Sequence, residues 1–189
     1  MNSQILTNIN NFIRKRLIES LGVLSVLLSI FLLFSIASYS PSDPNFIYTP
    51  ENSQIKNLGG FYGSVISDFL LQSFGLISFL LVFNFLTWGI NLISKKSVPN
   101  FTTKIFYILF YLIFGTTVLN IFYNDSFWLI DNGNGGFVGR SIKENIFYFT
   151  PLIENHYVIY ALSLLTVIFF ILSLSTKVNE LKNFLLLPF

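Results

Sequence analysis

The chain has 189 residues, of which 53% are hydrophobic, 18% aromatic and only 11% charged, whereas about a quarter of a soluble domain is charged. It has no cysteine and one histidine, which excludes a disulfide framework, a cysteine nucleophile and a Cys/His zinc site. The formal net charge of +2 is too small to attract nucleic acid by itself. This composition is that of an integral membrane protein.

Four charge-free apolar windows predict four transmembrane helices, because a helix needs about 20 apolar residues to cross the hydrocarbon layer. The expected spans cover about residues 20–40, 69–94, 105–123 and 155–176. Uninterrupted apolar runs of this length favour helices over the alternating strands of a barrel. The sequence therefore predicts an all-α fold, with one membrane domain over residues 1–189 whose four spans form two helical hairpins.

The first span also has features of a cleavable signal peptide. Three basic residues precede it, and the small-residue pattern Ser35-Ile36-Ala37 lies near its end. Its apolar stretch is longer than the usual length of about 7–15 residues in such peptides. This length favours an uncleaved span, and the sequence alone leaves the cleavage open.

Basic residues are distributed unevenly between the two sides of the predicted membrane domain. Eight of the eleven lie near the termini or in the short middle loop: Arg14, Lys15, Arg16, Lys95, Lys96, Lys104, Lys177 and Lys182. The two long loops hold Lys56, Arg140 and Lys143, with seven of the nine acidic residues: Asp43, Glu51, Asp68, Asp125, Asp131, Glu144 and Glu154. The positive-inside rule then predicts that both termini are cytoplasmic and that the two long loops lie outside.

Each long loop contains a similar glycine phrase. Gly59-Gly60-Phe61-Tyr62-Gly63 in the first loop matches Gly135-Gly136-Phe137-Val138-Gly139 in the second, 76 residues later. Each phrase follows an odd-numbered span and precedes an even-numbered one, which indicates a parallel repeat. A chance match between two phenylalanine-rich segments is the alternative. Apolar residues recur at helical spacing after both phrases, so we expect an amphipathic helix in each outer loop.

The spans offer little basis for chemistry. Their windows contain no acidic or basic residue apart from His156 at the edge of the fourth, and Asn84, Asn91 and Asn120 are expected to bond between helices. No carboxylate pair lies at membrane depth, and the chain has no phosphate-binding glycine loop. We therefore predict no catalytic residue, no cofactor, no metal site and no enzymatic activity in this chain.

The segment Ser40-Pro41-Ser42-Asp43-Pro44 directly follows the first span, where its prolines end the helix and Ser42 and Asp43 favour a turn. The Asn57 to Gly63 segment, Asp68 and the Phe74-Gly75 pair follow in order. This ordered set, over residues 40–75, resembles the amino-terminal membrane domain of the bacterial FtsK/SpoIIIE DNA translocases. The candidates for partner contact or loop structure are Ser40, Pro41, Asp43, Pro44, Asn57, Gly59, Gly60, Gly63, Asp68, Gly75, Gly135, Gly136 and Gly139.

The resemblance implies a membrane anchor at the division septum of the bacterial inner membrane. Such an anchor contacts the lipid bilayer and other division proteins, and it tethers a hexameric, ATP-driven motor that moves DNA. The resemblance also implies a homo-oligomer, which would be a hexamer. The sequence ends at Phe189 without a nucleotide site or a DNA-reading domain, so we expect no direct nucleic acid contact from this chain. The chain is then either a fragment of a longer protein or a free-standing anchor. The alternatives are a small transporter or channel subunit built from two hairpin repeats, or an assembly factor without a motor.

Overall fold

The computed structural model describes residues 2–48, 54–125, 129, 132–149 and 155–175. Over these residues it contains helices and no strand, and four helical stretches are long and apolar enough to cross a membrane. Both predictions, an all-α chain and four spans, are confirmed. The helices are α1 (Asn2–Ala37), α2 (Gly60–Phe74), the 3-10 turn η1 (Gly75–Ser78), α3 (Phe79–Lys95), α4 (Phe101–Phe122), α5 (Gly136–Phe149) and α6 (His156–Ser173).

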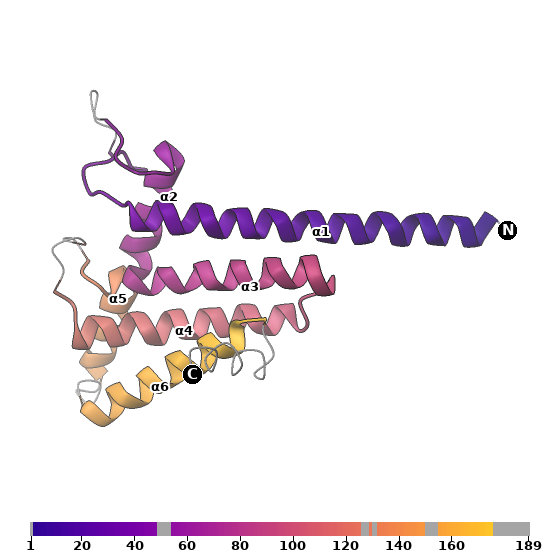
Figure 1. The fold of residues 1–189 in the computed structure, drawn as a ribbon. Coiled ribbons are helices and arrows are strands. Elements are labelled where there is room, and N and C mark those ends of the chain that lie inside the picture. The colour runs from indigo at the N-terminus through magenta and orange to yellow at the C-terminus, as the bar shows by residue number, and fades with distance from the viewer. Residues whose placement is uncertain (1, 49–53, 126–128, 130–131, 150–154, 176–189) are drawn as a thin grey trace, which may run out of the picture.

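The long helices pack as two antiparallel pairs, α1 with α3 and α4 with α6 (Figure 1). Glycines allow the close approach in the first pair: a Cβ added to Gly22 would lie 2.9 Å from the carbonyl oxygen of Gly89. Gly115 has the same role in the second pair, where an added Cβ would meet the Thr166 side chain at 2.9 Å. These glycines act as packing points between spans, because any side chain there would push the helices apart.

Two shorter helices, α2 and α5, lie crosswise to the long ones at one end of the bundle (Figure 1). We call this end, formed by residues 38–48 and 54–59, α2, residues 123–125, 129 and 132–135, and α5, the loop end. The opposite end, with the start of α1 and the turn between α3 and α4, is called the terminal end. The two amphipathic helices expected after the glycine phrases thus correspond to α2 and α5, which contact each other.

The buried core is small and lies toward the loop end, whereas most large apolar side chains on the long helices are exposed. Such exposure is expected where lipid, rather than protein, covers a helix. The core cluster consists of Leu32, Ile36, Tyr39, Leu71, Val82 and Leu129.

Helix α1 begins well before the first expected span. It has 36 residues, which at the usual helical rise makes it about 54 Å long, against about 30 Å for the hydrocarbon layer. Its amino-terminal part extends past the end of α3 (Figure 1). The polar residues before Ser20 do not stop the helix, because none of them is glycine or proline.

The stretch expected as the second span, 69–94, is divided in the structure. Helix α2 ends at Phe74, and η1 separates it from α3. The cause lies at Gly75, which has a φ of 57° that breaks the α-helical path. Residues 79–95 therefore form the part of this stretch that runs along the bundle, and residues 69–74 belong to the crosswise helix.

Several sequence-based expectations concern residues outside the described ranges. They include the end of the fourth expected span at residue 176 and five charged residues used for the orientation: Glu51, Asp131, Glu154, Lys177 and Lys182.

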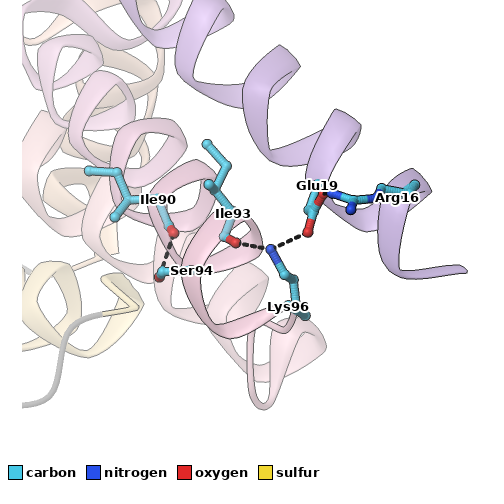
Figure 2. Close-up of polar contacts among 6 residues, drawn as sticks. All are labelled: Arg16, Glu19, Ile90, Ile93, Ser94 and Lys96. Carbon is cyan, nitrogen blue, oxygen red and sulfur yellow. Dashed lines mark hydrogen bonds and ion pairs between the residues drawn. The ribbon is translucent and has the colours of Figure 1, made fainter. Parts of the chain in front are cut away.

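At the terminal end, an ion pair joins α1 to the turn after α3. The Lys96 ammonium lies 2.5 Å from a carboxylate oxygen of Glu19, which also pairs with Arg16 at 2.6 Å (Figure 2). The Lys96 ammonium donates a further hydrogen bond to the carbonyl of Ile93 (Figure 2). Lys96 reaches these partners from a left-handed backbone conformation, with a φ of 57°, which ends α3.

Candidate functional site

The first long loop is closed by the carboxylate of Asp43. This side chain is buried, and its oxygens accept the backbone N–H of Lys56 at 3.0 Å and of Asn57 at 2.8 Å. A carboxylate that accepts backbone donors is among the stronger hydrogen-bonding groups. Asp43 therefore ties the turn after α1 to the segment that leads into α2, which is a structural role.

The other members of the Ser-Pro turn differ in burial. Pro44 is buried and its carbonyl accepts the Ser64 hydroxyl of α2 at 2.8 Å. Pro41 is exposed, and the hydroxyls of Ser40 and Ser42 share a hydrogen bond of 2.9 Å. Pro44 thus helps to seat α2, while Pro41 lies on the surface.

Asn57 connects three elements from a buried position. Its side-chain N–H group donates to the carbonyl of Ser35 in α1 at 2.8 Å and to the hydroxyl of Ser67 in α2 at 3.2 Å. Its side-chain oxygen accepts the backbone N–H of Gly59 at 2.9 Å. An asparagine can satisfy all three contacts because its amide carries both donors and an acceptor.

The glycines on either side of this turn pack against α1. An added Cβ on Gly63 would lie 2.8 Å from the hydroxyl of Ser35, and one on Gly59 would meet the same oxygen. Gly60 differs, since it has a φ of 65° and nothing within 4 Å of an added Cβ. Gly59 and Gly63 are therefore required by close packing, and Gly60 by backbone conformation.

The second glycine set reproduces this arrangement on α4. An added Cβ on Gly135 would lie 2.6 Å from the carbonyl oxygen of Thr116, and one on Gly139 would meet the same oxygen. Gly136 has a φ of 65° and begins α5, as Gly60 begins α2. In each phrase the first and last glycines thus pack on one residue of the preceding span.

The second glycine segment meets the end of α2 at Gly75. Its position leaves no room for a side chain, because the main chain of Asn134 lies against its Cα. The backbone N–H of Leu76 donates to the carbonyl of Asn134 at 3.0 Å. The Asn134 side chain in turn donates to the carbonyls of Tyr123 at 3.0 Å and Asp125 at 2.9 Å. The break between α2 and α3 is therefore the point where the second loop is attached.

Asp68 lies in a second connection between the two loops. Its carboxylate accepts the hydroxyl of Tyr39 at 3.0 Å, and that hydroxyl accepts the side-chain N–H of Gln72 at 3.1 Å. The amide oxygen of Gln72 accepts the side chain of Asn132, from the second loop, at 2.8 Å. Asp68, Gln72 and Asn132 also line a pocket of about 440 Å³ at the loop end.

The structure thus brings most of the predicted candidates together at one end of the molecule, mainly as loop-structure residues. Sequence reasoning missed the residues on which they rest: Ser35, Tyr39, Gln72, Thr116, Asn132 and Asn134. One signal was present in Ser35-Ile36-Ala37. This pattern also fits a signal-peptide cleavage site. In the structure, however, Gly59 and Gly63 pack on the Ser35 side chain, and this close contact requires a small residue there.

A polar cluster inside the bundle joins α3, α4 and α6. The buried Asn84 donates to the Ser173 hydroxyl at 2.7 Å and accepts the Tyr111 hydroxyl at 2.8 Å. Asn84 thus bonds between helices, as expected, and Asn91 donates from α3 to the carbonyl of Ser175, just after α6, at 2.6 Å. Asn120 differs from the expectation, since its side chain donates to the side chain of Asn124, four residues further along the chain, at 3.1 Å.

The same cluster satisfies the carboxyl end of α6. The indole N–H of Trp88 donates to the carbonyl of Ser173 at 2.9 Å. The Lys104 ammonium donates to the carbonyls of Leu172, at 3.3 Å, and Leu174. The last carbonyls of a helix have no partner within it, so these donors allow α6 to end where it does.

Within the residues that the structure describes, no group of three or more histidine, cysteine or acidic side chains is placed to hold a metal ion. The arrangement can fix the two long loops to the spans, and it offers an exposed surface and a pocket for contact.

Comparison with known proteins identifies the same family as the sequence motifs. The family model described as the 4TM region of DNA translocase FtsK/SpoIIIE matches residues 14–183. Two curated relatives are each named DNA translocase FtsK. The one from Vibrio vulnificus is 37% identical over 75 residues, which is 40% of this chain and 7% of the relative. The one from Rickettsia bellii is 28% identical over 152 residues, 79% of this chain and 20% of the relative.

A third relative with the same name, from Azospirillum brasilense, is 33% identical over 88 residues, 46% of this chain and 14% of the relative. The matched segments thus span between 7% and 20% of the length of these three relatives. The matching region is the membrane domain and not an ATPase motor, in agreement with the prediction that this chain is not an enzyme. No solved structure matches the chain significantly.

Proposed function

The chain belongs to the FtsK/SpoIIIE family of DNA translocases as its four-span membrane region, and we propose that it anchors such a translocase at the division septum. The observation that carries the proposal is the construction of the loop end. Asp43, Asn57 and the packed glycines hold it together, and the resemblance to the family rests on these same residues. An anchor that is placed by outer contacts needs such a defined surface.

Partner contact is assigned to the residues that this framework leaves exposed. Phe46, Ile47, Leu58 and Tyr62 are all more than half exposed at the loop end. Exposed apolar groups on connecting segments are typical of interaction sites. The division proteins of the outer face are the proposed partners, and Asp43, Asn57 and the glycines act by holding these side chains in place.

The proposed orientation has both termini in the cytoplasm of a bacterial cell and the loop end outside the inner membrane. The basic residues support it: Arg14, Lys15, Arg16, Lys95 and Lys96 all belong to the terminal end, where the positive-inside rule places the cytoplasm. We further propose a homo-oligomer, a hexamer by family resemblance, with no cofactor and no direct nucleic acid contact from this chain.

The test is the position of a fluorescent protein fused to the carboxyl end, imaged in live dividing cells. A band at midcell that depends on early division proteins is the expected result. Even fluorescence over the whole membrane, with the fusion intact on a gel, would overturn septal anchoring. A matched variant, Asp43→Asn, is expected to weaken the band, while Asp125→Asn, an exposed acidic residue of the same end, is expected to leave it unchanged.

A transporter or channel subunit is the second candidate, and the described interior argues against it. Asn84, Tyr111 and Ser173 are buried and hydrogen-bonded to one another. A transport site instead presents polar groups to its solute near the midplane. Solute or ion flux through the pure protein in liposomes would favour the transporter, and the anchor predicts no flux.

A further inference from the structure

Residues from both long loops line one pocket at the loop end. Its volume of about 440 Å³ falls within the range of about 300–1,000 Å³ that is usual for binding sites. Its lining comes from residues 45–47 of the first loop, Asn132 of the second loop, and four residues of α2, namely Asp68, Phe69, Gln72 and Ser73. Because three separate segments form this surface, it exists only when both loops are folded. The pocket is therefore a property of the native loop end.

The polar side of this pocket is held in a fixed arrangement. Asp68 accepts the Tyr39 hydroxyl, and Gln72 both donates to Tyr39 and accepts from Asn132. The hydrogen-bonded chain restricts the rotamers of the carboxylate and of the two amides. The entropic cost of ordering the carboxylate and the two amides is therefore incurred when the chain folds, so a ligand that binds these groups does not incur it again.

Another part of the pocket lining is apolar, and a tight turn displays it. The Asn45 side chain accepts the backbone N–H of Ile47 at 2.9 Å and of Tyr48 at 2.7 Å. This turn holds Phe46 and Ile47 at 76% and 98% exposure. Phe46 also meets Phe69 edge to face, with ring centroids 6.4 Å apart. A folded turn that keeps two large apolar side chains in solvent is typical of a contact surface.

The charge of the loops indicates what the pocket accepts. The two long loops and their short helices carry seven acidic and three basic residues, so the complementary partner is cationic. A lipid phosphate would be repelled by Asp68. A guanidinium fits better than a compact ammonium, because its planar set of donors can contact a carboxylate and neighbouring amide oxygens together.

We propose that this pocket receives an arginine side chain, flanked by apolar residues, from the outer segment of another membrane protein. The arginine pairs with Asp68 and the amide oxygens, and the flanking apolar residues pack on Phe46 and Ile47. This inference rests on the proposed function, since it gives the partner of that same surface a chemical identity.

The test compares two short peptides that bind to the chain in nanodiscs of phosphatidylcholine. One peptide has a single arginine between leucines, and the other has citrulline, its neutral isostere, in place of the arginine. We expect the arginine peptide to bind about tenfold more tightly, as for a charge-assisted pair that is partly shielded from water. The Asp68→Asn variant keeps an oxygen for the Tyr39 hydroxyl but loses the charge, so this preference should disappear.

The Asp125→Asn variant is the matched control, because it removes an exposed acidic residue of the same end that lies outside the pocket lining. It should retain the preference for arginine. Equal binding of the two peptides, as a lipid-filled pocket would give, overturns the proposal. An equal loss of preference in both variants also overturns it, because general electrostatics would then be the cause.

A second variant covers a failure of Asp68→Asn to fold. Phe46→Ala removes an exposed side chain, so the variant should fold normally and bind both peptides about fivefold more weakly. Unchanged binding contradicts the proposed site.

The septal anchor and the arginine pocket can be refuted independently of each other. A wild-type fusion that misses midcell overturns the septal anchor and leaves the peptide preference standing. Lost peptide preference with a normal midcell band overturns the pocket alone.

Discussion

Gly60 and Gly136, 76 residues apart, begin α2 and α5 with the same backbone φ of 65°. Their surroundings differ. An added Cβ on Gly60 would meet nothing within 4 Å, whereas one on Gly136 would lie 2.5 Å from the backbone nitrogen of Gly75 and 2.7 Å from the carbonyl oxygen of Ser73. The two halves of the loop end are therefore alike in conformation but not in packing.

This difference predicts unequal effects for the same substitution. Gly60→Ala should cost about 1–2 kcal/mol, the strain of a left-handed conformation for an L-residue. Gly136→Ala should cost clearly more, because its methyl group also collides with backbone atoms that cannot turn away. The measurement is the free energy of unfolding of each variant in the same detergent. Equal losses would show that the contact between the two segments is not tight.

The second prediction concerns the carboxylate of Asp43. In Asp43→Asn, an N–H group replaces one of the oxygens that accept the backbone donors of Lys56 and Asn57. We expect a loss of about 1–3 kcal/mol, the cost of a buried donor without its acceptor. Hydrogen exchange at these two amides should accelerate. Asp125→Asn is the control, and a similar exchange rate in both variants would contradict this role.

A third prediction tests the buried contact between Asn84 and Tyr111. Removing each group alone, by Asn84→Ala and Tyr111→Phe, leaves the other with a missing partner, so the double variant should lose less stability than the sum of the two. We expect a coupling of about 1 kcal/mol, the scale of hydrogen bonds between membrane helices. Unfolding of the four proteins in one membrane mimetic gives this value. Strict additivity would exclude the hydrogen bond.

The fourth prediction compares two lysines of the terminal end. Lys104 lies in α4 and is buried, and its ammonium donates hydrogen bonds to the carbonyls of Leu172 and Leu174 at the end of α6. Lys104→Met should cost about 1–3 kcal/mol and should loosen the end of α6, because it leaves these carbonyls without a donor.

Lys96→Met supplies the matched control for this prediction. Lys96 pairs with Glu19 at a partly exposed position, 34% for the lysine side chain (Figure 2). Such a pair contributes at most about 1 kcal/mol. Hydrogen exchange along α6 should therefore increase in the Lys104 variant alone. If Lys96→Met disturbs α6 as strongly, the specific capping by Lys104 is refuted.

Local sequence patterns predict much of the architecture of this protein. Apolar windows of sufficient length and the lack of interior charge predict four spans, because the cost of burying backbone and charge in lipid leaves few alternatives. The phrase from Ser40 to Gly75 likewise indicated the family and the region of the loop end. Gly60 and Gly136 could be selected as turn residues for the same local reason.

The tertiary structure decided what these residues do. Asp43 and Asp68 look equivalent as loop acidic residues, yet one is buried against backbone donors and the other lines a pocket. In the sequence, Lys104 contributes only to the prediction of the cytoplasmic side. In the structure, its ammonium donates a hydrogen bond to a carbonyl at the end of a helix, 70 residues away. Sequence determined the number of spans and the membrane environment, because these depend on composition over one span. The partners of each polar group depend on which distant segments meet, and only packing of the whole chain settles that.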